Sequence, residues 1–356
     1  MERRICEDRR EQKFSAISAL SAVSAFRWYR SQQSPHHSLE KPSLSRRVRN
    51  WVRGLLPEPD VRGKVMVLHA RQAFPKLWAW AGMFSEFHSV LGALAYAEAR
   101  GAAAVRVDFR SPLYLEPARG SNWWTYFFDS DKMRLSAGAG ARDEVHLASR
   151  LAKFGRHGGF CDVVNGKTPY LYPMTYGIDR VELHRLLTTH VRVRGEILDE
   201  AARWGVASLD RDAYVVGVHY RGTDSTHGLA GWLADYRVSR VPYELYANEV
   251  RAVVDAASAR TYQLLVATDE SEFVGFMRRE FPGRVVCVES APRARAGGRA
   301  VHLDRMLPAS NYDKGKSGLV DCLLLASANY LVKGRSNLSD ASLVFNPRLP
   351  YSFCVR

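Results

Sequence analysis

Apolar positions divide the chain after residue 60 into short strands that alternate with longer helices. Lys64–His69 (KVMVLH) is a largely apolar run typical of a buried strand, and Ala103–Asp108 predicts a second one. Between them, Phe84–Arg100 repeats its apolar residues at helical spacing, and Gly101 stands where a C-cap glycine belongs. Strand, helix and strand in this order form a βαβ unit, which implies a parallel sheet.

The middle of the chain has a weaker pattern. Residues Ser136–Tyr176 contain glycine-rich and basic stretches without clear periodicity, which predicts loops and short helices that belong to the first sheet. Arg180–Trp204 is rich in charge and predicts a single helix that leads toward a second unit.

The alternation resumes after residue 210 and predicts a second parallel α/β unit. The expected strands are Tyr214–His219, Gln263–Ala267, Arg284–Val288 and Tyr330–Lys333, and the expected helices are Tyr243–Ala257, Glu270–Glu280, Ser317–Ala328 and Leu338–Phe345. We therefore expect residues 1–56 to form a basic tail and linker, residues 57–205 a first Rossmann-like domain, and residues 206–356 a second one.

Composition agrees with two globular domains in a reducing compartment. The 356 residues are 46% hydrophobic, which is enough for two cores at a typical domain size of about 100–200 residues. The five cysteines are scattered singly and form no Cys-x-x-Cys pair, so a structural zinc site is not expected. An odd cysteine count without a cleavable signal predicts a cytoplasmic protein.

The net charge of +14 predicts attraction to an anionic partner, such as nucleic acid, acidic lipid or a phosphorylated substrate. Roughly half of the excess lies before residue 57, and the sequence has no RNP, zinc-finger or helix-turn-helix motif, which argues against nucleic acid. Phe14–Phe26 follows basic residues but is too short to span a membrane. This segment has three interpretations: a disordered or amphipathic tail, a helix lying on the membrane surface, or a signal segment. The second interpretation implies peripheral membrane association.

The segment Val216–Asp224 (VGVHYRGTD) carries the most informative chemistry, because a buried strand ends in His219, Arg221, Thr223 and Asp224. An arginine at this place can form a fork of hydrogen bonds to a diphosphate and stabilise the charge that develops on a leaving nucleotide. The alternative is a structural Arg–Asp pair at a strand end.

A second informative segment is Ser317–Ser339. Its apolar helix carries Asp321 near the expected start, where an acid either complements the helix dipole or accepts the N1–H and amino group of guanine. The strand after it breaks into a loop in which Ser336 or Asn337 is an N-cap candidate, and exposed amides at such a helix start can bind phosphate. Capping alone would also explain the serine.

Several segments in the same order resemble the α1,6-fucosyltransferase group, which includes core fucosyltransferases of N-glycans, the rhizobial nodulation fucosyltransferase and the related protein O-fucosyltransferases. The resemblance is carried by VGVHYRGTD, by Leu264–Glu270 (LLVATDE), by Val320–Pro347, by Ala81–Phe109 with its glycine-containing first loop at Gly82, and by Ser121–Phe128 (SNWWTYFF). These segments cover roughly Val65–Pro347.

The resemblance implies a GT-B fold, with two Rossmann-like domains facing a cleft, and inverting transfer from GDP-fucose without a metal or a cofactor. The first domain would take a glycan or glycolipid acceptor, and the second would bind the nucleotide sugar. His219 would lie near the guanine, Arg221 would hold the β-phosphate, and Asp321 would read the base. Ser336 and Asn337 match the loop that contacts phosphate, and Asp224 and Asp269 match acids close to the cleft. Gly82, Thr223 and Asp269 are also expected to contact the nucleotide.

The chain departs from this group where the group has a lysine and a catalytic glutamate, since Ser225 and Leu229 stand there. The general base is therefore sought among His227, Asp224 and Glu86. A transferase for another nucleotide sugar and a non-catalytic protein that binds a nucleotide sugar or a glycan remain alternatives. Trp123 and Trp124 are interpreted as packing residues, and Gly315-Lys316-Ser317 is rejected as a Walker motif.

Overall fold

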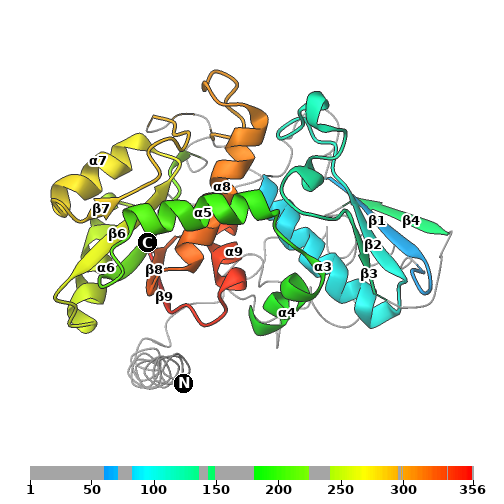
Figure 1. Ribbon diagram of the computed structural model, residues 1–356, viewed down its shortest axis with the longest axis horizontal. Helices are drawn as coiled ribbons and strands as arrows, with labels where there is room; N and C mark the ends of the chain where they lie inside the picture. Colours follow the sequence, from blue (N-terminus) through cyan, green and yellow to red (C-terminus); the bar gives the residue numbers. More distant parts are fainter. Residues whose placement is uncertain are drawn as a thin grey trace, which may run out of the picture. The chain divides into compact units, whose positions relative to one another are not determined.

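The computed structural model describes residues 60–70, 82–135, 143–148, 180–223, 241–295, 298, 300–334 and 336–354. Every described residue belongs to one compact unit within Ser43–Arg356. Within it, the described elements build two β-sheets with helices packed against them (Figure 1).

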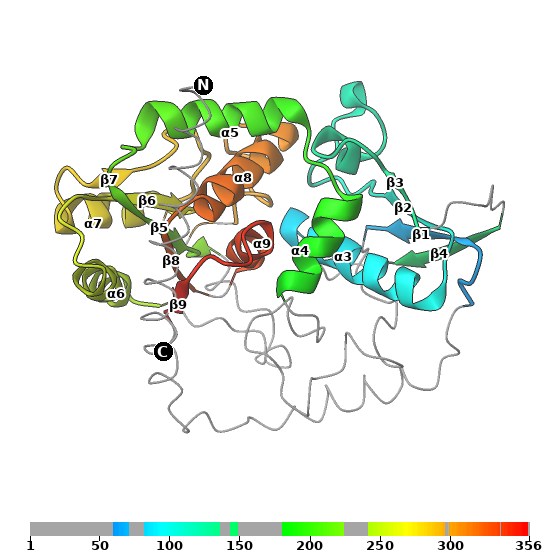
Figure 2. The ribbon, with the colours of Figure 1, turned by 60° about the horizontal axis from the view of Figure 1, so that its bottom comes forward.

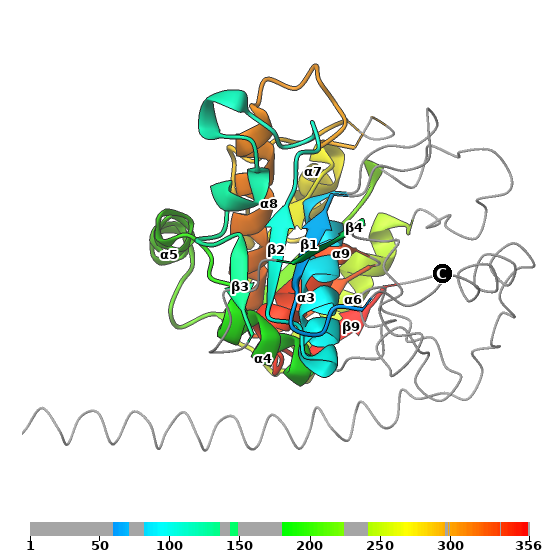
Figure 3. The same cartoon turned by 90° about the vertical axis from the view of Figure 1, so that its right-hand side faces the viewer.

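The first sheet has the strand order β3-β2-β1-β4. β1 (Val65–His69) pairs in parallel with β2 (Ala104–Asp108) and with β4 (Glu144–Ala148), and β3 (Lys132–Arg134) is antiparallel to β2. The helix α3 (Met83–Arg100) packs on one face of this sheet (Figure 3). It ends as predicted at Gly101, whose backbone adopts a left-handed conformation with a φ of 67°.

The second sheet is parallel throughout, with the order β7-β6-β5-β8-β9. Its strands are β5 (Tyr214–Tyr220), β6 (Tyr262–Thr268), β7 (Val285–Val286), β8 (Tyr330–Lys333) and β9 (Tyr351–Phe353). Numbered by their succession in this sheet, the strands lie in the order 3-2-1-4-5, so the direction of winding reverses between β5 and β8. Ligands of doubly wound sheets bind at this reversal, outside the carboxyl ends of the strands.

Helices cover both faces of the second sheet (Figure 2). On one face lie α6 (Tyr243–Ala256) and α7 (Ser271–Glu280), which pack on alternate residues of β5 such as Val216 and Val218. On the other lies α8 (Asn311–Ala326), and its hydrophobic cluster continues without interruption to α3 and the first sheet. The two sheets therefore share one core.

Two further helices connect the sheets. α4 (Arg180–His190) packs on α9 (Asn337–Phe345), and α5 (Gly195–Ser208) packs on α8. The single helix predicted for Arg180–Trp204 is wrong, because the chain between α4 and α5 is extended. Val193 forms an isolated antiparallel bridge to Phe128, and the Arg194 guanidinium donates a hydrogen bond of 3.0 Å to the Thr125 carbonyl.

The predicted fold class, α/β with two sheets built on parallel strands, is confirmed. The predicted strand at Arg284–Val288 is reduced to the two residues of β7, and β3, β4 and β9 were not predicted. β3, β4 and β9 all lie at sheet edges, and they lack the apolar run that marks a buried strand. The domain boundaries at residues 56 and 205 remain predictions, and the tail segment Phe14–Phe26 lies outside the described residues.

α8 begins earlier than predicted, at Asn311, because the Ser310 side chain caps it and accepts a hydrogen bond from the Asp313 amide. Gly315, Lys316 and Ser317 therefore lie inside a helix, which confirms that they form no Walker loop. Gly315 lets α8 approach the aromatic segment Ser121–Phe128 closely, since a Cβ at this position would lie 2.4 Å from the Phe127 ring.

The aromatic segment is a short 3-10 turn, η2 (Trp123–Tyr126), that follows the turn η1 (Pro117–Arg119). Trp123 and Trp124 are fully buried and pack against Phe109, which confirms their predicted packing role. Of the helices in the described ranges, none combines the length and apolar character needed to cross a membrane.

Candidate functional site

The carboxyl ends of β5 and β8 place the predicted site residues His219, Arg221 and Ser336 at the point where the winding of the second sheet reverses. His219 is in register with Lys333, so the two side chains leave neighbouring strands at the same level. Arg221 follows the end of β5, and Ser336 follows the end of β8 at the start of α9.

The turn that carries Arg221 is held by Asp269, at the end of β6. The Asp269 carboxylate accepts a hydrogen bond of 2.8 Å from the Gly222 amide and one of 2.5 Å from the Thr223 hydroxyl. A side chain at Gly222 would collide with the buried Glu270, because a Cβ would lie 2.2 Å from its carboxylate oxygen. The backbone is thus fixed on both sides of Arg221, by β5 before it and by the contacts of Gly222 and Thr223 after it.

The Arg221 guanidinium lies in a partly desolvated environment. Burial lowers its pKa, whereas Asp269 and the Tyr114 hydroxyl favour its charged form. Burial, together with the charges of Arg221 and Lys314, lowers the pKa of His302 to about 3. A neutral imidazole therefore lies close to a positive guanidinium.

The start of α3 approaches the same place from the first sheet. The Met83 amide donates a hydrogen bond of 3.1 Å to the Tyr114 hydroxyl. A Cβ at Gly82 would lie 3.8 Å from that hydroxyl and 3.8 Å from His302 Nε2. Burial raises the pKa of Tyr114 to about 12, and both Arg221 and Glu86 act on it electrostatically.

The start of α9 offers a positive, amide-rich environment. Ser336 is its N-cap, as predicted, and its side chain accepts a hydrogen bond of 3.3 Å from the Leu338 amide. Beneath the turn, the fully buried Lys333 ammonium forms an ion pair of 2.6 Å with Asp340. Burial lowers the pKa of His219 to about 3, with Lys333 and Arg221 acting in the same direction, so this histidine is neutral.

Asp321 occupies a different part of α8 from the one predicted. It lies ten residues after the first residue of the helix, so of its two interpretations the one in which it complements the helix dipole in the first turn is excluded. Burial raises the pKa of Asp321 to about 7, and the Arg293 guanidinium acts in the opposite direction. The carboxylate thus titrates close to neutral pH, which makes it a candidate for reading hydrogen-bond donors.

The structure gathers part of the predicted site. Arg221, Glu86 and Gly82 meet around Tyr114 and His302, and His219 lies beside Lys333 near the start of α9. Thr223 and Asp269 support the turn at Arg221, and their predicted nucleotide contacts stay predictions. Asp224 and His227, which were candidates for the general base, lie outside the described residues, as do Ser225 and Leu229.

Sequence reasoning missed three residues of this region: Tyr114, His302 and Lys333. Tyr114 and His302 lie in segments without a helical or alternating pattern. Tyr114 follows β2 and approaches Arg221 only when the two sheets pack together, and His302 approaches it from the segment before α8. Lys333 was recognised as the end of a strand. A lysine that closes an apolar strand and precedes a glycine loop was the available signal for it.

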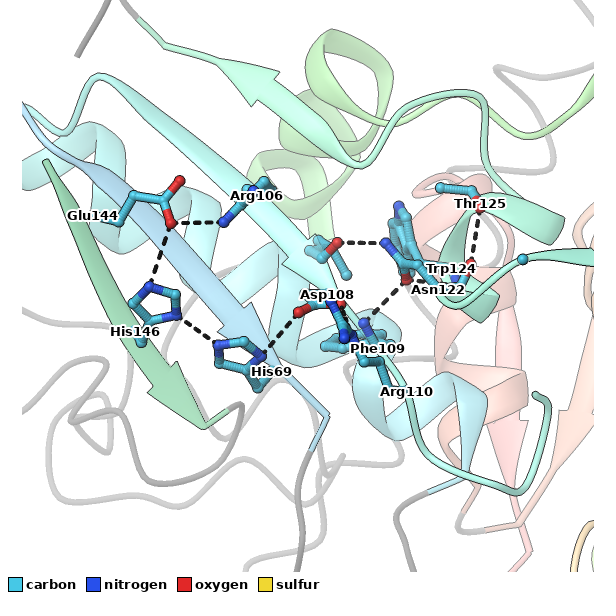
Figure 4. Close-up of polar contacts among 12 residues, drawn as sticks. His69, Arg106, Asp108, Phe109, Arg110, Asn122, Trp124, Thr125, Glu144 and His146 are labelled. Carbon is cyan, nitrogen blue, oxygen red and sulfur yellow. Dashed lines mark hydrogen bonds and ion pairs between the residues drawn. The ribbon is translucent and has the colours of Figure 1, made fainter. Parts of the chain in front are cut away.

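A second polar cluster lies on the first sheet, on the face opposite to α3 (Figure 4). His69 Nε2 and His146 Nδ1 are 2.8 Å apart and share a hydrogen bond between nearly coplanar rings. The other ring nitrogen of His69, Nδ1, lies 3.4 Å from the Asp108 carboxylate, and that of His146, Nε2, lies 3.3 Å from the Glu144 carboxylate. Among the residues that the structure describes, no group of three or more His, Cys, Asp or Glu side chains is arranged to hold a metal ion.

No protein-family model matches the chain, and no curated protein matches it. Solved structures of fucosyltransferases match it at low sequence identity and with TM-scores below 0.5. Fucosyltransferase NodZ from Bradyrhizobium is 15% identical with a TM-score of 0.46, covering 80% of this chain and 94% of that chain. NodZ α-1,6-fucosyltransferase soaked with GDP-fucose is 16% identical, with the same TM-score, covering 80% and 94%. POFUT1 in complex with GDP is 11% identical with a TM-score of 0.43, covering 84% and 99%.

Proposed function

We propose that the chain is an inverting glycosyltransferase that uses a GDP-sugar as donor and needs no metal ion. GDP-fucose is the proposed donor. The observation that carries the proposal is the pairing of Arg221 with the start of α9 on either side of the point where the winding of the second sheet reverses. A fixed guanidinium and a capped helix start are complementary to a diphosphate.

In this proposal the second domain, residues 206–356, holds the donor. Arg221 forms charge-assisted hydrogen bonds to the β-phosphate, and the backbone amides of Ser336 and Asn337 bind phosphate oxygens. The ionised Asp321 carboxylate accepts the N1–H and the amino group of guanine. His219 is neutral, so it contributes hydrogen bonding without adding charge.

The reaction requires one proton transfer and one displacement. A base takes the proton from an acceptor hydroxyl, the oxygen attacks the anomeric carbon from the side opposite the nucleotide, and the bond to the β-phosphate oxygen breaks. The electron pair remains on GDP, where Arg221 stabilises the additional negative charge. Among the three candidates for the base, Glu86 is the one that the structure describes, and it lies at the start of α3, close to Tyr114. His227 and Asp224 are the other two.

The proposal assigns the acceptor, a glycan or a glycolipid, to the first domain at residues 57–205. The basic segment 1–56 would associate with anionic membrane surfaces from the cytoplasmic side, because each Lys or Arg near such a surface contributes about 1 kcal/mol.

A panel of nucleotide sugars offered to the purified protein, with analysis of the nucleotide released, tests the function. We expect GDP from GDP-fucose to be the main product when glycan acceptors are present. Release of UDP from a UDP-sugar would favour a transferase of different specificity. Binding of GDP without any turnover across the panel would favour a non-catalytic nucleotide-sugar-binding protein.

A further inference from the structure

His88 connects α3 to the first residue of α9. Its Nε2 lies 3.0 Å from the Asn337 carbonyl oxygen, and the side chain is only 2% exposed. Because a carbonyl oxygen can only accept, Nε2 carries the proton and donates it. Burial lowers the pKa of His88 to about 4, so the ring is neutral and carries this one N–H. The bond therefore persists at neutral pH.

The start of α9 is also supported from within the second sheet. Ser336 caps the helix, and the Asp340 amide donates a hydrogen bond of 3.0 Å to the Ser336 carbonyl. The Lys333–Asp340 ion pair holds the same turn from β8. His88 differs from these contacts because it reaches the turn from α3, which precedes the second sheet by more than 100 residues.

The far end of α9 receives a comparable contact, which makes a matched comparison possible. His184, on α4, donates through Nδ1 a hydrogen bond of 2.9 Å to the Val344 carbonyl. The Phe87 ring, next to His88 in the chain, stacks on Phe345 with the ring centroids 5.7 Å apart. Two histidines thus hold the two ends of α9, and only the one at Asn337 lies beside the phosphate site of the proposed function.

We propose that His88 is a positioning residue for donor binding, which orients the first-turn amides of α9 toward the phosphates of GDP. This inference rests on the proposed function. A helix start binds an anion through the direction of its free N–H groups, so a small rotation of the first turn weakens every amide contact at once. Through His88, helix α3 takes part in donor binding without touching the nucleotide.

The test compares three variants by GDP affinity and thermal stability. In His88→Ala the bond to Asn337 is lost, and we expect the Kd for GDP to rise roughly tenfold, the equivalent of one buried hydrogen bond. His88→Gln can donate from its amide nitrogen at a similar place, so its Kd should stay within about threefold of wild type. His184→Ala removes the comparable bond at the other end of α9, and it should lose thermal stability while keeping its GDP affinity.

Hydrogen exchange of the segment Asn337–Phe345 separates the positioning role from the proposed function. We expect faster exchange at the start of α9 in His88→Ala and exchange close to wild type there in His88→Gln and His184→Ala. If wild type does not bind GDP, the proposed function fails, and hydrogen exchange alone shows whether His88 holds the turn. An unchanged GDP Kd in His88→Ala, or an equal rise in His184→Ala, would overturn the positioning role.

Discussion

The Asp269 carboxylate accepts a hydrogen bond of 2.5 Å from the Thr223 hydroxyl, which joins the end of β6 to the turn after β5. The same carboxylate accepts the Gly222 amide at 2.8 Å. These bonds fix the backbone on the C-terminal side of Arg221, while β5 fixes the N-terminal side. A guanidinium held in this way needs little reorganisation when charge develops on a leaving group.

Replacement of Asp269 by Ala should reduce both the stability of the fold and donor binding. It leaves the Gly222 amide and the Thr223 hydroxyl without their acceptor, at a cost of about 1–3 kcal/mol for each buried group. Thr223→Val removes one of the two bonds and should cost less. Chemical denaturation together with GDP titration measures the effects, with the exposed Asp255→Ala as a control. Unchanged GDP affinity in Asp269→Ala would show that the turn does not depend on this carboxylate.

The affinity for GDP should rise with pH through neutrality. Burial raises the pKa of Asp321 to about 7, and only its ionised form can accept both guanine donors. Below that pKa we expect about a tenfold loss of affinity per pH unit. UDP measured in parallel corrects for titration of the phosphates, and Asp321→Asn should remove the difference between the nucleotides. A ratio of GDP to UDP affinity that is constant from pH 6 to 8 would contradict this role.

Moderate acid should destabilise the protein. Burial lowers the pKa of His219 and His302 to about 3 and that of His88 to about 4, all below the usual histidine pKa of about 6.5. The unfolded chain therefore binds more protons between about pH 4 and 6.5, and the stability present above pH 6.5 is lost as the pH falls. Asp321 opposes part of the loss, because its native-state pKa is raised.

Urea unfolding at several pH values between 4.5 and 7 measures this dependence. His88→Gln removes one of the three histidines and should reduce the slope by about 1.4 kcal/mol per pH unit at most. A stability that does not change over this range would mean that the histidines are not buried in their neutral form.

The general base is tested by comparing His227→Ala, Asp224→Asn and Glu86→Gln in one series. We expect His227→Ala to lower kcat strongly with little change in GDP affinity, because a neutral histidine three residues after Asp224 is a suitable general base for the acceptor hydroxyl. Asp224→Asn should disturb both quantities, since this acid follows the phosphate arginine closely in the chain. If only Glu86→Gln abolishes turnover, the base lies at the start of α3.

The sequence predicted the parts of the molecule that depend on local patterns. β5, β6, β8 and the limits of α3 and α9 follow from apolar periodicity, from Gly101 and from the cap at Ser336. The motif after β5 also identified Arg221. These features are encoded within about ten to twenty residues, the range over which propensity and capping act.

What the sequence did not predict depends on how the two sheets meet. His88 lies in the apolar stripe of α3, and its importance follows only from Asn337, which comes 249 residues later. Tyr114 and His302 join Arg221 through contacts between distant segments. The buried Lys333–Asp340 pair likewise depends on how α9 returns over β8. Periodicity contains no information on such tertiary contacts.

The central claim, a guanine-specific diphosphate site built on Arg221 and the start of α9, is tested most directly by thermal unfolding with GDP or UDP in the absence of divalent metal. A ligand that binds only the native state stabilises it by about 2.7 kcal/mol at a hundredfold excess over its Kd. We predict clear stabilisation by GDP, a smaller effect of UDP, and loss of both in Arg221→Ala, whose own unfolding temperature should stay close to that of wild type. Equal stabilisation by the two nucleotides, or stabilisation by GDP that survives in Arg221→Ala, would contradict the account.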